Sequence, residues 1–246
     1  MTSNILKEIV QYTTSVDLDL VKITGNDQST VLEAITSDKT MVLKAIFKNQ
    51  IAEFVGTAAS PKIAGLPNLG RLNVILTIPE YRENVQIATT NRNSGEPETI
   101  VFNNDQGDFT NIYRLMPSSV ANNLVPSVSL KTAASWNLDF EPLAQNIQKF
   151  RYQVQANSDS VNFQTFTKNG NLYFELGEVS SHQGNFVFHQ AKGNLADKMS
   201  WPVKQVLGIL NLPGDKRMRI SDVGVMQITV DSGVADYEYL IPAVSK

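Results

Sequence analysis

Apolar residues recur at helical spacing in four segments of the chain. Near the N-terminus, Ile5, Ile9 and Tyr12 stand at i, i+4 and i+7, so their side chains share one face of a helix. In the second half, a similar series of four apolar residues runs from Leu143 to Val154. The pattern predicts helices over residues 3–15, 66–77, 141–155 and 200–211.

Segments rich in β-branched and aromatic residues, separated by polar turns, predict six strands in each half. Asn26 and Asp27 mark one turn, and Asp105 and Asp108 are ordinary turn residues in another. In the first half the predicted strands are 18–23, 30–36, 41–47, 85–90, 99–103 and 110–116. In the second half they are 160–167, 171–176, 185–190, 218–222, 225–230 and 236–241.

The same order of elements therefore occurs twice, as a helix–βββ–helix–βββ unit. Pro67 and Pro202 begin corresponding short helices and are 135 residues apart, while Pro79 and Pro213 follow these helices at a separation of 134 residues. Any α+β chain can be cut into similar halves, but concordant offsets favour an internal duplication. We predict an α+β fold of two similar domains.

A segment with two prolines, two serines and two asparagines, residues 117–126, separates the halves. Because proline restricts the preceding residue to extended conformations, we expect an extended connector that neither a helix nor a central strand crosses easily. The predicted organisation is a first domain over residues 1–120, a connector over 121–132 and a second domain over 133–246.

Composition narrows the possible classes of function. The chain has 246 residues, no cysteine and two histidines, which excludes disulfides, thiol nucleophiles and zinc–thiolate sites. The N-terminus has no signal-peptide pattern, and no apolar run approaches the roughly 18 residues of a membrane span. A net charge of −3 argues against an ordinary nucleic-acid binder, which is usually basic.

The sequence contains none of the common catalytic patterns for dinucleotides, P-loops, nucleophile elbows or zinc proteases. His182 and His189 are interpreted as structural or exposed residues rather than metal ligands. Asp17 and Asp19 would lie on one strand face and could in principle hold a divalent cation, but a solvated face is favoured because no third acid is nearby. We assign no catalytic residue, metal site or cofactor.

The charges are divided unevenly between the predicted helices and the rest of the chain. The helices carry five basic and two acidic residues, so they have a net charge of +3 and the remainder has −6. One acid, Glu141, has a local reason to be there, because the helix dipole favours a carboxylate at the first turn and Pro142 suits the first helical position. The basic residues are Lys7, Arg71, Lys149, Arg151 and Lys204.

Two interpretations of these helices stay open at this point. Their other polar residues are mostly amides and hydroxyls, and sparse Lys and Arg among neutral amides can touch phosphates weakly without fixing one register. Helices also favour Lys, Arg and Gln for conformational reasons alone.

These features together resemble a DNA polymerase sliding clamp, most closely the processivity clamp of T-even-type bacteriophages and their marine relatives, the cyanophages. The resemblance rests on the repeated unit, the Pro-rich connector, the short helix WPVKQVLGIL at 201–210 and the terminal strand YEYLIPA at 237–243. It spans nearly the whole chain and lies in architecture, since clamps have no invariant catalytic motif.

The resemblance implies a homotrimeric ring with helices on the inside and sheets outside. Neighbouring subunits would join by their edge strands, at 110–116 of one copy and 185–190 of the next. The DNA-facing residues would be Lys7, Gln11, Asn68, Arg71, Gln145, Lys149, Arg151 and Lys204.

The resemblance also implies an apolar groove that binds peptides of the DNA polymerase and other partners, beside the connector and the C-terminal strand. For each single groove candidate, a role in tethering the domains or in the core is equally consistent with the sequence. The candidates are Leu124, Val125, Pro126, Val128, Ile241, Pro242 and Val244.

The favoured function is thus a non-enzymatic platform that encircles double-stranded DNA, is opened by a clamp-loader ATPase, and works in the cytoplasm of an infected bacterial host, away from membranes. The alternative is a virion structural or assembly protein with a duplicated β-rich fold, which leaves the basic bias of the helices unexplained. An enzyme with an unrecognised site is a third and weaker hypothesis.

Overall fold

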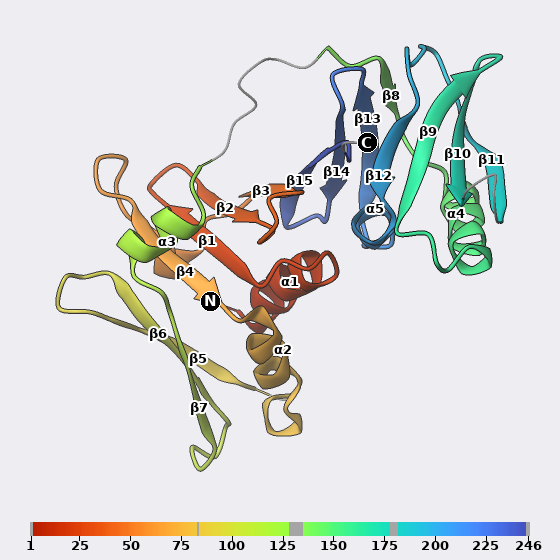
Figure 1. The fold of residues 1–246 in the computed structure, drawn as a ribbon. Helices are drawn as coiled ribbons and strands as arrows, with labels where there is room; N and C mark the ends of the chain where they lie inside the picture. Colours follow the sequence, from red (N-terminus) through yellow and green to blue (C-terminus); the bar gives the residue numbers. More distant parts are fainter. Residues whose placement is uncertain (1, 83, 128–134, 178–181, 245–246) are drawn as a thin grey trace. The chain divides into compact units, whose positions relative to one another are not determined.

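The structure is a computed structural model that describes residues 2–82, 84–127, 135–177 and 182–244 (Figure 1). The chain forms two compact units, called unit 1 and unit 2 below. Unit 1 comprises Met1–Val128 with Gly233–Tyr237, and unit 2 comprises Ser129–Ser232 with Glu238–Lys246. Within the described ranges, no helix is both long and apolar enough to cross a bilayer.

Unit 1 contains a four-stranded sheet in the order β4-β1-β2-β3 and a three-stranded sheet in the order β5-β6-β7, all antiparallel. The first helix and the strands of the larger sheet are α1 (Ser3–Thr14), β1 (Leu20–Gly25), β2 (Thr30–Ile35), β3 (Val42–Phe47) and β4 (Lys62–Pro67). The remaining elements are α2 (Leu69–Thr77), β5 (Gln86–Asn91), β6 (Pro97–Asn103), β7 (Thr110–Arg114) and α3 (Ser118–Leu124).

The core of unit 1 is mainly aliphatic. Buried and less buried positions alternate along β2 and β3, so each strand turns one face inward. Leu6 and Ile9 of α1 meet this core and are completely buried. The helix begins where the Thr2 hydroxyl accepts a hydrogen bond from the Ile5 backbone N–H at 3.4 Å, which satisfies one of the free donors of the first turn.

Unit 2 repeats this plan with sheets in the orders β11-β10-β9-β12 and β15-β14-β13-β8. Its first elements are β8 (Leu138–Phe140), α4 (Ala144–Ala156), β9 (Asn162–Lys168), β10 (Asn171–Gly177) and β11 (Gln183–Gln190). They are followed by β12 (Met199–Pro202), α5 (Val203–Leu210), β13 (Asp215–Ser221) and β14 (Val225–Asp231). The last strand, β15 (Ala235–Pro242), contributes its first residues to unit 1 and its remainder to unit 2.

The core of unit 2 is also mainly aliphatic, but it contains a cluster of aromatic rings in mutual contact. Phe174 on β10 lies with its ring centroid 3.9 Å from that of Phe188, 4.7 Å from that of Phe163 and 5.2 Å from that of Phe150. Trp201 is fully buried, and its indole N–H donates to the Thr165 hydroxyl at 2.8 Å, so its polar atom is satisfied.

The α+β fold and the duplication are confirmed, but β4 in the first half and β8 and β12 in the second half were not predicted. Every predicted strand is present, and each repeat has the order helix–ββββ–helix–βββ because β4 and β12 precede the second helix. Neither β4 nor β12 shows the usual sequence pattern of a strand. The first contains Gly65 and ends at Pro67, and the second has four residues and ends at Pro202, so it takes the start of the helix predicted over 200–211.

The prediction of an extended connector across residues 117–126 is wrong, because α3 occupies Ser118–Leu124. Pro117 stands at the N-cap, and its missing N–H costs nothing there, since a helix leaves its first donors unpaired. Pro126 follows the C-cap residue Val125. The two prolines therefore bracket a helix rather than forbid one.

The predicted start of the third helix is also wrong. The helix α4 begins at Ala144, and Leu143 before it is extended, with φ −76° and ψ 138°. Pro142 disfavours the helical conformation for Glu141, so neither residue belongs to the first turn. Glu141 therefore lies outside the helix and its dipole explanation no longer applies.

Candidate nucleic-acid interface

In unit 1 the candidate surface is the exposed side of two helices, α1 and α2, which lie side by side (Figure 1). Lys7 and Gln11 are exposed, four residues apart on one face of α1, while Leu6, Ile9 and Val10 face the core. The spacing that buries one side of the helix thus fixes which polar residues point outward.

The second helix of unit 1 contributes Arg71, which is also exposed. Asn68 precedes it in a left-handed conformation, with φ 54°, and its side-chain oxygen accepts from the Arg71 backbone N–H at 3.0 Å. Asn68 is therefore an N-cap, and its amide NH₂ is the part left for an outside ligand. Sequence reasoning placed it on the surface correctly but missed the cap.

In unit 2 the corresponding helices are α4 and α5, which also contact each other. Gln145 and Lys149 on α4 and Lys204 on α5 are exposed, while Ile147 and Phe150 are buried. Each unit thus presents a pair of helices with basic and amide side chains on the outer face.

The guanidinium of Arg151 is engaged within unit 2. Its Nε donates to Asn211 Oδ1 at 2.7 Å, and Nη1 donates to Gln148 Oε1 at 3.2 Å. Asn211 is the C-cap residue of α5, so Arg151 ties α4 to the end of α5. This half-buried residue combines a structural role with a position at the candidate surface.

The true helix bounds sharpen the charge contrast. Without Glu141, the four helices that match the predicted ones hold five basic residues and a single acid, Glu8. Glu8 is half-buried and accepts a hydrogen bond from the Tyr237 hydroxyl at 3.2 Å, while Tyr237 stacks on Tyr12 with centroids 4.2 Å apart. The acid is thus turned to an internal contact of unit 1, which leaves basic residues to dominate the outer face.

The candidate groove residues fall into two classes by burial. Val125 and Ile241 are almost completely buried and belong to cores. Val128 lies outside the described residues. The exposed candidates are Leu124 and Pro126 in unit 1 and Pro242 and Val244 in unit 2.

The two segments predicted to join subunits are both at sheet edges. The strand β7 is the last of the order β5-β6-β7, and β11 is the first of the order β11-β10-β9-β12. Each has an exposed apolar side chain near its middle, Ile112 at 57% and Val187 at 38%. Edge strands with exposed apolar residues are suited to pairing with another chain.

A metal site at Asp17 and Asp19 is not supported by the backbone. Both residues precede β1, and Asp17 adopts φ 65°, so the two carboxylates do not follow strand geometry. The Asp19 carbonyl accepts from Leu69 N–H at 3.1 Å, which anchors the start of α2. In the part of the chain that the structure describes, no group of three or more metal-ligating residues occurs.

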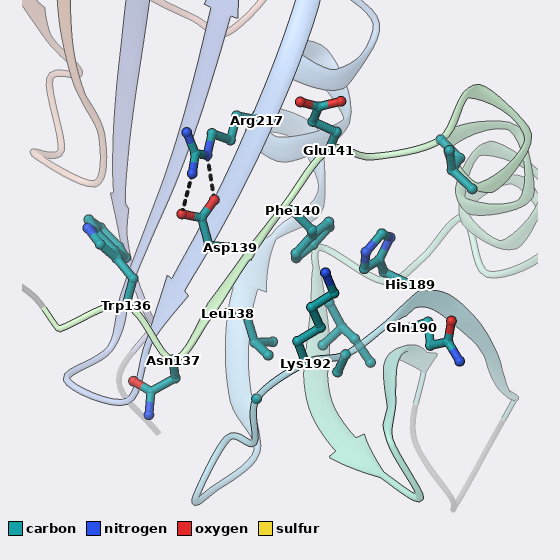
Figure 2. Close-up of a pocket in the computed structure, with 14 residues that line it drawn as sticks. Trp136, Asn137, Leu138, Asp139, Phe140, Glu141, His189, Gln190, Lys192 and Arg217 are labelled. Carbon is teal, nitrogen blue, oxygen red and sulfur yellow. Dashed lines mark hydrogen bonds and ion pairs between the residues drawn. The ribbon is translucent and has the colours of Figure 1, made fainter.

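Unit 2 also has a cavity of about 640 Å³ that sequence reasoning missed (Figure 2). It lies between β8 and the end of β11, where His189 stacks on Phe140 with ring centroids 4.3 Å apart. Burial, with a smaller effect from Lys192, lowers the pKa of His189. Two hydrogen bonds from Arg217 to Asp139, at 2.5 and 2.7 Å, are the main cause that lowers the pKa of Asp139.

Comparison with solved structures identifies the fold as the clamp fold of PCNA. A structure of A. fulgidus PCNA with the C-terminal region of FEN-1 bound matches with a TM-score of 0.69 at 10% identity, covering 100% of this chain and 97% of the other. PCNA from Thermococcus kodakaraensis matches with a TM-score of 0.67 at 12% identity, covering 99% and 98%. No family model and no curated protein matches the sequence.

Proposed function

We propose that this protein is a DNA sliding clamp, a ring of identical subunits that encircles duplex DNA and holds the replicative polymerase on it. The proposal is carried by one observation: in a clamp fold, both units expose a pair of helices whose outer faces hold basic and amide residues, on a chain of net charge −3. On this account the protein is a scaffold and catalyses no reaction.

The surface has the electrostatics that sliding requires. Exposed Lys7, Arg71, Lys149 and Lys204 would meet phosphates, which carry no sequence information. Such contacts are screened by salt and are exchanged easily between neighbouring phosphates. The acidic remainder of the chain disfavours DNA binding elsewhere on the subunit. Weak contact inside a closed ring allows movement along DNA without release.

Ring formation would use the two edge strands. Pairing β7 of one subunit with β11 of the next covers both edges and the exposed Ile112 and Val187. A head-to-tail contact of this kind closes when the rotation between subunits fits a whole number of copies. We propose three copies, which gives a ring of six similar domains.

The test combines mass and activity. The proposal expects a particle near three times 27.2 kDa that stimulates a cognate polymerase on primed circular DNA only with a loader and ATP. A trimer without stimulation would leave a structural role, such as a virion component. A monomer at micromolar concentration that also fails to stimulate synthesis would contradict the proposal.

A partner-peptide groove is part of the proposal. Its accessible candidates are the exposed residues Leu124 and Pro126 in unit 1 and Pro242 and Val244 in unit 2. Because Val125 is buried, its substitution would disturb the core and is a poor probe. Titration of a polymerase C-terminal peptide onto Leu124→Ser should show weaker binding than to the unchanged chain. Equal affinity would remove Leu124 from the groove.

We further propose that the clamp serves a T-even-type bacteriophage and acts in the cytoplasm of the infected bacterium, with a phage polymerase and a clamp-loader ATPase as partners. The support is the resemblance at residues 201–210 and 237–243. Reconstitution with a T-even-type loader should give stimulation that a loader from an unrelated system does not.

A further inference from the structure

We infer that the cavity of unit 2 beside the end of β11 receives the 104–109 loop of a second copy of this chain. The inference rests on the proposed ring and adds the contact that sets the direction and register of the subunit junction. It concerns the loop between β6 and β7 on one copy and, on the other, the cavity wall formed by His189, Lys192 and β8.

The loop is a preformed, acidic tip. Asp105 and Asp108 are exposed, and Phe109 is 37% exposed. Asn84 donates to Asp105 at 3.2 Å and Asn104 donates to Asp108 at 2.7 Å, so each carboxylate is held while part of it still faces outward. A loop that is already ordered loses little conformational entropy on binding.

The receiving end of β11 is basic. Lys192 is exposed and stands at the cavity beside the His189–Phe140 stack (Figure 2). Lys168 is exposed at the neighbouring turn, where Asn171 pairs with both Lys168 and Gln190. Of the two acids that line the cavity, Asp139 forms ion pairs with Arg217 and Arg219 at 2.5 and 3.1 Å, and Glu141 lies at the far end of β8 from Lys192.

The exposed apolar residues select a register for the two edges. If β7 and β11 pair antiparallel with Thr110 opposite His189, then Ile112 falls opposite Val187, and their side chains cover each other on one face. Continuing toward the loop, past the irregularity of β11 between Val187 and His189, brings Asp108 to the Ala191–Lys192 end of the strand. The loop then enters the cavity, and Phe109 approaches the aromatic stack.

The charges select the same direction. In the antiparallel arrangement the exposed Arg114, which pairs with Glu98 at 3.1 Å, lies toward the Gln183 end of β11. The exposed Asp159 is at that end, because it shares a hollow with Gly177, the residue opposite Gln183. A parallel arrangement would bring Asp108 toward Asp159 and Arg114 toward Lys192. Opposite charges therefore meet at both ends of the paired strands in the antiparallel arrangement, whereas like charges meet in the parallel one.

Cysteine cross-linking tests the juxtaposition directly, because the chain has no native cysteine. The full chain carrying Asp108→Cys and Lys192→Cys should give covalent dimers and trimers with a short bismaleimide, whereas Arg114→Cys with Lys192→Cys should stay monomeric on a denaturing gel. The opposite pattern, or no product from either pair in a preparation that is trimeric and stimulates the polymerase, would overturn the inference and leave the proposed function standing.

A charge exchange tests whether attraction between Asp108 and Lys192 stabilises the association of subunits. Asp108→Lys should weaken subunit association about tenfold at low salt, Lys192→Asp should do the same, and the two together should restore it. Asp108→Asn, which keeps an acceptor for Asn104, shows whether loss of the loop bond alone matters. The matched control is Asp27→Lys with Lys44→Asp, both exposed in unit 1. Single variants that associate normally, or a double variant without recovery, would contradict the contact.

Discussion

Unit 1 and unit 2 build the same order of elements around mostly aliphatic cores that arrange their aromatic rings differently. Both cores contain many aliphatic residues, such as Leu6 and Leu32 in unit 1, but in unit 2 the rings of Phe163, Phe174 and Phe188 also form one cluster in contact. The comparison shows that the repeated pattern of buried and exposed positions fixes the fold, while the side chains that fill the buried positions can differ.

The helix faces of the two units differ in a way that matters for experiments. In unit 1, Lys7 and Arg71 occupy exposed positions, whereas in unit 2 Arg151 also links α4 to Asn211. Charge in unit 1 can therefore be changed with little structural cost, while in unit 2 a change at Arg151 affects packing as well.

The largest effect is expected from reversing charge on both helix faces. Combined Glu substitutions at Lys7, Arg71, Lys149 and Lys204 should reduce loader-dependent processivity at least tenfold, because each phosphate contact becomes a repulsion. Processivity is read from product length on primed circular DNA, and the particle mass should stay that of the ring.

Unit 1 alone supplies a matched control for this experiment. Lys7→Glu with Arg71→Glu should impair processivity, whereas Lys39→Glu with Lys44→Glu changes the net charge equally at exposed sites outside the helices and should not. Equal effects of the two pairs would show that net charge, rather than the helix face, matters.

The next largest effect is expected in the core of unit 2. Phe174→Ala should lower the free energy of unfolding by about 3–5 kcal/mol, because it removes a buried ring that contacts Phe163 and Phe188 and leaves a cavity. Leu32→Ala in unit 1 should cost about 2–5 kcal/mol. Hydrogen exchange should show increased opening mainly in the unit that carries each change, and uniform opening would contradict separate cores.

A smaller effect on the free energy of unfolding should distinguish the hydrogen-bonded Arg151 from the exposed Arg71. Arg151→Met should lower the free energy of unfolding by about 1 kcal/mol, because the hydrogen bonds to Asn211 and Gln148 are lost. Arg71→Met should change it by less than about 0.5 kcal/mol, as is usual at exposed sites. Denaturant titration measures both, and equal values would remove the distinction between the helix faces.

The smallest effect concerns pH in unit 2. Because burial lowers the pKa of His189, the unfolded chain binds its proton at a higher pH than the folded chain does. The neutral His189 ring therefore makes its full contribution to the free energy of unfolding above the pKa of histidine in the unfolded chain, about 6.5. This contribution is lost as the pH falls below that value.

Replacing the imidazole tests this titration. His189→Phe keeps a ring against Phe140 and should reduce the loss of stability between pH 7.5 and pH 5.5. Denaturant titration at both values measures the difference. The hydrogen-bonded Asp38 and Asp139 have lowered pKa values and act below this window. An unchanged pH dependence in the variant would exclude His189 as its source.

Much of the fold could be predicted because buried and exposed positions alternate clearly. Strands such as β2, with a strict alternation, and helices such as α1 were located within two residues of their ends. The missed strand β4 has a glycine in its middle, and the missed helix α3 lies between two prolines that individually disfavour helices. In both cases the local residue types disfavoured the element that forms, and packing against the rest of the unit outweighed that preference.

The candidate surface was predicted only in part. Exposure of Lys7 and Lys149 follows from helical spacing, which a sequence displays. The bond from Arg151 to Asn211 joins residues 60 positions apart, and the cavity beside His189 is formed by β8 and β11 together. Such juxtapositions depend on how elements pack and leave no periodic signal, so Asp105 and Asp108 could be identified only as turn residues.

The central claim is that the protein holds DNA by encircling it. The most direct measurement loads the labelled protein onto nicked circular duplex with a loader and ATP, isolates the complex by gel filtration at moderate salt, and then cuts the DNA once with a restriction enzyme. Encirclement predicts stable retention on the circle and loss after cutting, as the ring slides off the ends. Equal retention on circular and linear DNA would show binding by affinity and would contradict the account.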